Sequence, residues 1–274
     1  MTITLDSHYT IGQLHLFCQD YVCHGWEPYP YVILADGCSA ESDSDVGARL
    51  LALNARRMLP RFMAAATDEA GRRACHWRLG RRIVRRAARQ ARELGADNVL
   101  DATLLIAWCD GATVYVHLYG DGCLVARRAD GGMVAIQVEY AGNAPYYLSY
   151  LLDRERWALY QVATGDPLAA QSVSYLNETG TTSRLERFDA PLVFSFSLKA
   201  FPTVAVATDG LQSFVSAGTN ERLSALDVAR EMLDFDPSQD HFVKHRLYEL
   251  LLEYSKEQVF NLDDLGIGIF AQTA

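Results

Sequence analysis

Two periods in the spacing of apolar residues divide the first part of the chain into strands and helices. Short apolar runs at 14–23 and 31–35 predict two strands. Over 45–66 the apolar residues recur every three to four positions, which predicts a helix, and a second helix is expected over 72–94. Because a short connection joins them, we expect these helices to pack as an antiparallel pair.

Strand patterns dominate the remainder of the chain. They are expected at 102–108, 113–119, 123–128, 134–140, 158–163, 192–198, 203–208 and 265–271. Asp110-Gly111 and Asp130-Gly131 are typical of hairpin turns, and two more helices are expected at 223–233 and 240–258. This order predicts an α+β fold in which two packed, mainly antiparallel sheets are flanked by pairs of helices. No repeat or linker divides the chain, so residues 1–274 are expected to form a single domain.

Composition narrows the class of protein. The net charge of −9 and the isoelectric point near 5.2 make nucleic acid an unlikely partner, because phosphate backbones require a positive surface. Six cysteines without a Cys-x-x-Cys pair indicate reduced thiols and a cytoplasmic location. Residues 1–13 lack the pattern of a signal peptide, and apolar stretches such as 103–109 are too short to span a bilayer. We therefore expect no membrane partner.

Three acidic positions lie at the ends of apolar runs. Asp36-Gly37 and Asp209-Gly210 each follow a short apolar run, and Asp263 immediately precedes another. A single Asp-Gly pair is most often a turn, but three acids at strand ends can converge on one site. Carboxylate oxygens are the ligands that Mg²⁺ and Mn²⁺ prefer, and a glycine lets the backbone approach an ion closely. Together these positions predict a centre for divalent cations.

A longer series of motifs contains these acids. In chain order it reads Cys-Gln-Asp20, Ala-Asp36-Gly37, Asp101-Ala-Thr-Leu-Leu-Ile-Ala, Tyr-Gly-Asp121-Gly, Ala-Thr-Asp209-Gly-Leu and Asp263-Asp264. This series resembles that of the protein phosphatase 2C (PPM) family, over residues 14–270. The resemblance implies a β-sandwich flanked by helix pairs and the hydrolysis of phosphoserine and phosphothreonine in proteins. It also implies a phosphorylated protein substrate, a cognate serine/threonine kinase and a bacterial branch of the family.

The resemblance assigns roles to individual positions. Two Mn²⁺ or Mg²⁺ ions would be bridged by Asp36, with the Gly37 carbonyl on one ion and Asp209 and Asp263 on the other. Asp20 would act in the second shell through metal-bound water. The implied mechanism is in-line attack on phosphorus by a hydroxide bound at the two-metal centre. The catalytic role of Asp36, Asp209 and Asp263 is therefore exerted through that water.

Several positions depart from the family pattern. His15 stands where many members have a phosphate-binding arginine, and Cys38 stands where many have a histidine that protonates the leaving group. Asp121 would serve a third, weaker cation, but Ser213 replaces an acid that often accompanies it. Gln19 replaces a common glutamate beside Asp20. These departures keep open an alternative function, a regulatory or partner-binding module of this fold with weak or no turnover.

Other patterns compete with this interpretation. Cys75 and Arg81 have the spacing of cysteine-dependent phosphatases, but the residues between them are bulky and helical, whereas a phosphate loop needs small ones. Nine arginines in 72–92 indicate a solvated outer helix, or else a docking face for an acidic partner. His241 and His245 have metal-ligand spacing without a third ligand nearby. The aromatic residues of 140–160 could border the substrate cleft or simply pack in the core.

Overall fold

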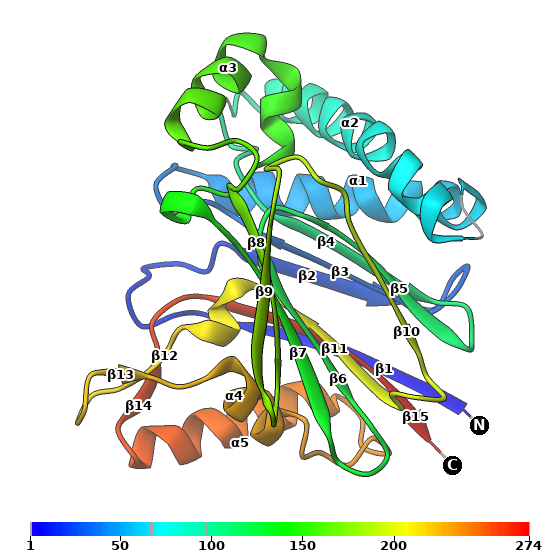
Figure 1. The fold of residues 1–274 in the computed structure, drawn as a ribbon, viewed down its shortest axis with the longest axis vertical. Helices are drawn as coiled ribbons and strands as arrows, with labels where there is room; N and C mark the ends of the chain where they lie inside the picture. The colour runs from blue at the N-terminus through cyan, green and yellow to red at the C-terminus, as the bar shows by residue number, and fades with distance from the viewer. Residues whose placement is uncertain (1, 66–67, 97, 274) are drawn as a thin grey trace.

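The computed structural model describes residues 2–65, 68–96 and 98–273 of the chain. Its strands are β1 (Thr2–Thr10), β2 (Asp20–Gly25), β3 (Tyr31–Asp36), β4 (Leu104–Cys109), β5 (Thr113–Tyr119), β6 (Gly122–Arg127), β7 (Met133–Tyr140), β8 (Gln171–Asn177), β9 (Gly180–Glu186), β10 (Leu192–Ser197), β11 (Thr203–Ala207), β12 (Phe214–Ser216), β13 (Glu221–Arg222), β14 (Val259–Asn261) and β15 (Leu265–Thr273). They form a seven-stranded sheet in the order β1-β15-β11-β6-β7-β8-β9 and a five-stranded sheet in the order β10-β5-β4-β3-β2. A small third sheet has the order β13-β12-β14. The two large sheets are antiparallel throughout and face each other (Figure 1).

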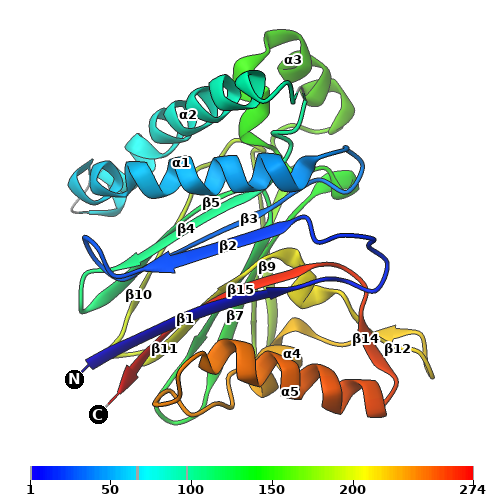
Figure 2. The ribbon, with the colours of Figure 1, turned by 180° about the vertical axis from the view of Figure 1, so that it is seen from behind.

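Helices cover the outer faces of both large sheets. They are α1 (Ser44–Ala65), α2 (Glu69–Glu93), α3 (Arg154–Ala163), α4 (Ala225–Met232) and α5 (Phe242–Lys256), with 3-10 turns η1 (Ala141–Asn143), η2 (Leu148–Leu152) and η3 (Asp209–Gln212). The pair α1 and α2 lies over the five-stranded sheet, and α4 and α5 lie over the seven-stranded sheet (Figures 1 and 2). The expected β-sandwich with flanking helix pairs is therefore confirmed. Within the described residues, no helix combines the length and the apolar character needed to cross a membrane.

Strand β3 shows how period-two alternation builds the layers. Val32 and Leu34 point into the core between the two sheets, whereas Tyr31, Ile33 and Ala35 pack under α1 and α2. All five side chains are buried, which explains why the sequence reads as one continuous apolar run. The strand consequently carries Asp36 to the edge of the packed region.

Some predicted elements differ from the observed ones. The strand expected at 158–163 is wrong, because this segment belongs to α3, which Asp153 caps by accepting hydrogen bonds from the N–H groups of Glu155 and Arg156. Strand β1 was not expected, nor was the β8–β9 hairpin. The strand expected at 14–23 corresponds to β2, which begins at Asp20. The expected end of the first helix, at 66, lies outside the described residues.

Candidate metal centre

Strand register places two of the predicted acids face to face. Strands β2 and β3 pair antiparallel with Asp20 directly opposite Asp36. Side chains of directly opposed residues in an antiparallel pair lie on the same face of the sheet, about 5 Å apart at Cβ. Two like charges at such a position destabilise the pairing, so the arrangement is not explained by folding alone.

Asp209 joins this pair from the opposite sheet. It follows β11 and opens η3, and its charge acts on both Asp20 and Asp36. Burial, followed by the charge of Asp263, raises the pKa of Asp209 to about 6. Burial and the neighbouring acids, Asp20 first, also raise the pKa of Asp36 well above its usual range. The negatively charged form of this cluster is therefore disfavoured in the protein alone.

Asp263 and Asp264 have different positions, although they are adjacent in sequence. The Asp264 side chain is buried and accepts hydrogen bonds from the N–H groups of Gly12, at 2.8 Å, and Gln19, at 2.5 Å. Asp263 is partly exposed, and burial raises the pKa of its carboxyl. His15 contacts both acids, with Nε2 3.4 Å from Asp263 Oδ1 and Nδ1 3.1 Å from Asp264 Oδ2. Asp264 thus fixes the loop that presents His15 and Asp263.

Gly37 is held where a side chain would not fit. A Cβ atom at this position would lie 2.7 Å from the Ser44 carbonyl oxygen. The Gly37 N–H donates to the Gln19 carbonyl at 3.3 Å, while the Gln19 side-chain amide donates to Ser44 Oγ at 2.5 Å. In the described parts of the chain, no backbone N–H outside the regular helices and strands donates to the Gly37 carbonyl oxygen. The backbone at Gly37 is thereby fixed between Gln19 and the first turn of α1.

Two further predicted residues lie at the margins of the cluster. Asp121 is buried at the β5–β6 connection, and burial, followed by the charge of Asp209, raises its pKa well above the usual range. Cys38 is partly buried and lies near Tyr147, and burial raises the pKa of the Tyr147 hydroxyl. The charges of Asp36 and Asp121 also act on Tyr147. The aromatic segment before η2 therefore does border the acidic cluster.

The residue types at this site fit divalent cations. Among the described residues, no lysine or arginine forms an ion pair with Asp20, Asp36, Asp121 or Asp209. The Asp20 Oδ1 atom is buried without a hydrogen-bond partner, and buried carboxylates are normally paired or coordinate metals. The acids approach one another in pairs, and within the described residues no three side chains form a compact ligand group. The unpaired buried oxygen and the all-oxygen donor set are those that Mn²⁺ or Mg²⁺ requires.

The competing motifs do not build a second catalytic centre. Cys75 is buried inside α2, where its thiol donates to the Arg72 carbonyl at 3.3 Å, so Cys75 and Arg81 lie on a continuous helix rather than on a loop.

Asp101, which opens the motif Asp101-Ala-Thr-Leu-Leu-Ile-Ala, forms a 2.6 Å ion pair with Arg156. The carbonyl of Asp101 accepts from the Cys38 N–H at 2.8 Å, so this acid supports the loop that contains Cys38.

Sequence reasoning missed the positioning role of two residues, Thr208 and Ser213. The Thr208 hydroxyl donates to Asp20 Oδ2 at 2.9 Å and accepts from the Gly266 N–H at 2.9 Å. Ser213 Oγ donates to the Gly210 carbonyl at 2.8 Å and accepts from the Asp263 N–H at 3.2 Å. Thr208 directly precedes Asp209-Gly210, and this position beside a predicted metal-binding acid was the sequence feature that could have indicated its role. Ser213 thereby connects the loop that follows Asp209 to the backbone of Asp263 and stabilises their relative position.

Comparison with known proteins decides the family. The family model described as protein phosphatase 2C matches residues 6–251. The chain belongs to this family. No curated protein sequence matches the chain significantly.

Solved structures of bacterial phosphatases share the protein phosphatase 2C fold of this chain. A bacterial serine phosphatase superimposes with a TM-score of 0.58 at 12% identity, covering 100% of this chain and 99% of the other. The serine/threonine phosphatase Stp1 from Staphylococcus aureus gives a TM-score of 0.56 at 12% identity, with 100% and 96% coverage. The catalytic domain of the serine threonine protein phosphatase PstP, in complex with two manganese ions, gives 0.54 at 16% identity, with 98% and 99% coverage. At these identities the likeness concerns the fold.

Proposed function

We propose that this member of the protein phosphatase 2C family hydrolyses phosphoserine and phosphothreonine in proteins, at a two-metal centre built from Asp36, Gly37, Asp209 and Asp263. The observation that carries the proposal is that the buried Asp20 lies opposite Asp36, with Asp209 close by, and that the described residues supply no cationic partner to these acids. Such a cluster is costly to folding, and perturbed carboxylates in contact are typical of a functional site. The family membership supports phosphate ester hydrolysis as the chemistry.

The chain contributes positioning and charge to this reaction. Bound Mn²⁺ or Mg²⁺ supplies Lewis acidity and activates water. Asp36, opposite Asp20 in the β2–β3 pairing, would hold the cations together with Asp209, and the hydroxyl of Thr208 donates to Asp20 and fixes its orientation. His15 is anchored beside Asp263, where its imidazole can donate a hydrogen bond to a phosphate oxygen. The hydroxyl of Tyr147 and the thiol of Cys38 provide donors on the side nearest Asp36 and Asp121.

Phosphatase assays test this proposal directly. Wild-type protein is expected to hydrolyse p-nitrophenyl phosphate and a phosphothreonine peptide with MnCl₂ and to lose this activity in EDTA. Asp36→Asn should reduce the rate constant by at least about a hundredfold, because it removes a carboxylate charge that would hold the cations. Asp130→Asn is the matched control, since Asp130 also precedes a glycine but lies in an exposed hairpin turn. Equal rates for wild type and Asp36→Asn would refute the proposal.

The departures at His15 and Cys38 make a partner-binding module the second candidate. Its signature would be Mn²⁺ binding by calorimetry that is lost in Asp36→Asn, without turnover of either substrate by the wild type. That outcome would assign the site to cation-dependent recognition. Robust Mn²⁺-dependent turnover would exclude the module as the main function.

A further inference from the structure

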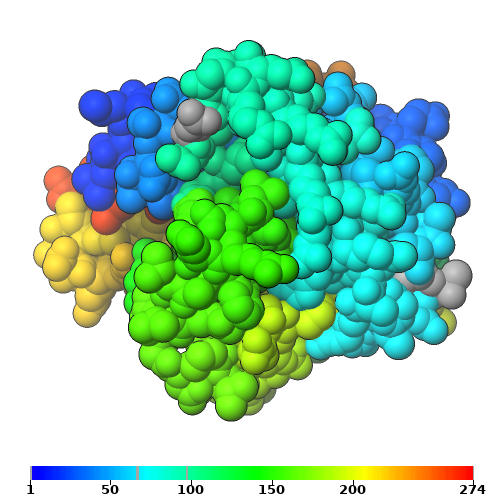
Figure 3. All heavy atoms as spheres, turned by 90° about the horizontal axis from the view of Figure 1, so that it is seen from above, coloured from blue at the N-terminus to red at the C-terminus, as the bar shows by residue number. Residues whose placement is uncertain are grey.

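A second cavity lies away from the acidic centre, between helix α2 and the η2–α3 segment. Its volume is about 810 Å³, within the range of small-molecule sites. The two walls come from segments far apart in sequence, which lie against each other on the face seen in Figure 3. None of the predicted metal-binding acids lines it. Tyr150 lines this cavity, whereas Tyr147 lies near Cys38, so the short segment 147–150 separates the two sites.

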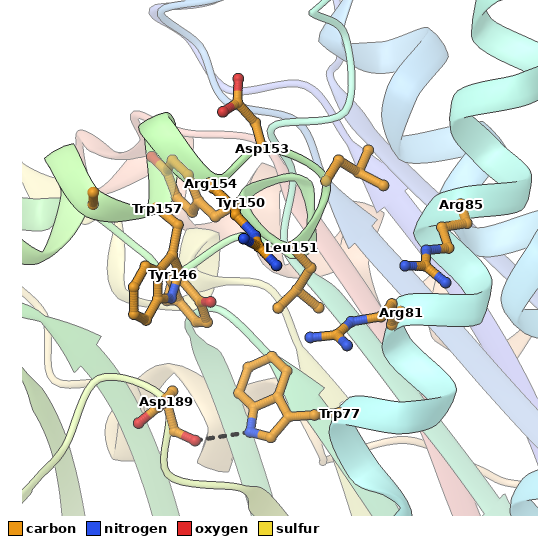
Figure 4. Close-up of a pocket in the computed structure, with 12 residues that line it drawn as sticks. Trp77, Arg81, Arg85, Tyr146, Tyr150, Leu151, Asp153, Arg154, Trp157 and Asp189 are labelled. Carbon is orange, nitrogen blue, oxygen red and sulfur yellow. Dashed lines mark hydrogen bonds between the residues drawn. The ribbon is translucent and has the colours of Figure 1, made fainter.

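Arginine supplies the charge of the cavity. Arg81 and Arg85 extend from α2 toward the opposite wall, and Arg154 comes from the first turn of α3 (Figure 4). Among the described residues, none of these three forms a salt bridge or a side-chain hydrogen bond. The protein as a whole carries a net charge of −9, so this local excess of positive charge is not a general property of its surface.

The two acids at the cavity are already engaged. Asp153 caps α3 by accepting from the Glu155 and Arg156 N–H groups, and Asp189 forms an ion pair with Arg187. Neither carboxylate forms an ion pair with the three arginines of the cavity. An anion with several oxygens would satisfy them, because guanidinium groups bind phosphate in a forked geometry.

Aromatic rings form much of the remaining lining. Trp77 and Trp157 face the cavity from its two walls, and Tyr146 and Tyr150 stack with centroids 5.7 Å apart. The Trp77 ring is held by a 2.8 Å hydrogen bond from Nε1 to the Asp189 carbonyl, drawn as a dashed line in Figure 4. Tyr146 is buried and packs edge-on against Trp77 at 5.4 Å. Trp77, Tyr146 and Tyr150 are held by these contacts before any ligand arrives, so a planar ligand would bind without ordering these three rings.

We propose that this cavity binds a phosphorylated aromatic metabolite of the mononucleotide class. The arginines match the phosphate, and the tryptophans match a base, since a base stacked on an aromatic side chain contributes affinity without demanding one sequence. Inorganic phosphate alone would leave the aromatic walls unused. A nucleic acid strand would extend beyond the cavity onto a protein whose overall charge repels it. The inference does not depend on phosphatase activity.

Isothermal titration calorimetry with AMP and GMP tests the site. The full chain is titrated in EDTA, so that nucleotide bound through cations at the acidic centre does not contribute, and adenosine and inorganic phosphate are titrated in parallel. Saturable binding of a mononucleotide is expected, at least about tenfold tighter than either fragment, because both parts of the ligand are recognised. Absence of saturable binding at millimolar nucleotide would overturn the proposal. Equal affinity for adenosine or for phosphate would also overturn it.

Paired arginine substitutions locate the binding. The double variant Arg81→Ala with Arg85→Ala should weaken nucleotide binding by at least about tenfold, through lost charge-assisted hydrogen bonds. The control is Arg86→Ala with Arg89→Ala, which removes the same charge from exposed positions of α2 outside the cavity and should change the affinity by less than about twofold. Circular dichroism checks the folding of both. Equal losses in the two pairs would show a diffuse charge effect and refute the assigned site.

Discussion

A buried pair of histidines, one on α2 and one on β5, makes the stability of the fold sensitive to acid. His76 of α2 and His117 of β5 are fully buried, with their Nδ1 atoms 3.0 Å apart and their rings stacked at 5.3 Å. Phe62 and Trp108 pack on the His117 ring, at 4.8 and 5.6 Å. Burial, with the nearby charge of Arg72, lowers the pKa of His117 to about 3. Burial and the neighbouring imidazole also lower the pKa of His76 well below its usual range.

The direction of the pH effect follows from these shifts. In the unfolded chain each imidazole takes up a proton near pH 6.5, whereas in the folded protein His117 stays neutral down to about pH 3. The unfolded state therefore binds more protons between these values, and stability is lost as the pH falls below about 6.5. At about pH 5.5 one such histidine favours unfolding by RT ln 11, about 1.4 kcal/mol. Most of this effect is absent at about pH 7.5.

Urea unfolding followed by tryptophan fluorescence measures the effect. His117→Phe keeps a planar ring against Trp108 but cannot titrate, so its loss of unfolding free energy between about pH 7.5 and 5.5 should be about 1.4 kcal/mol smaller than that of the wild type. Comparing the two pH dependences cancels the contribution of the acidic centre, which both proteins share. His245→Phe, at an exposed position of α5, is the control. Identical pH dependence in wild type and His117→Phe would refute the reasoning.

Two further predictions concern close contacts near the site. Gly47→Ala should lower the unfolding free energy by about 3 kcal/mol or more, because its Cβ would lie 1.5 Å from the Val99 carbonyl oxygen; an unchanged urea midpoint would contradict this. Thr208→Val should cost about 1 to 3 kcal/mol in metal-free protein, since it removes the donor to the buried Asp20 carboxyl and the acceptor of a backbone N–H. Thr203→Val, at a buried threonine at the start of β11, the strand that Thr208 follows, should cost less in the same urea titration.

The fold was predictable where burial produced a clean period. Strand β3 and helix α1 are buried on the sides that their apolar residues predict. Strand β9 offers no such pattern, because six of its seven residues are exposed and pairing with β8 holds it in place. The α3 segment was misassigned because a short apolar run fits strand and helix equally well. Its decisive signal was the cap at Asp153, just outside that run.

The acidic site was predictable in its members but not in its geometry. Asp36 and Asp209 follow buried strands, so the sequence places them at strand ends. Nothing local specifies that Asp20 opposes Asp36, because register between β2 and β3 is set by which faces of both strands are buried. The different burial of Asp263 and Asp264 also depends on tertiary structure. The backbone N–H groups that donate to the Asp264 carboxylate come from residues about 250 positions away.

The same strand pairing that stabilises the sandwich brings its acids together. Burial of β3 on both faces fixes the register with β2, and that register sets the Asp20 carboxyl against Asp36. Packing of the hydrophobic layers offsets the repulsion between the Asp20 and Asp36 carboxylates, for which the described residues supply no lysine or arginine partner. Under the proposed function, cation binding converts this repulsion into attraction, so metal affinity and fold stability are linked through the same few carboxylates. Local rules of stability are broken most clearly at Asp20 and Asp36, and that is where the chemistry is proposed.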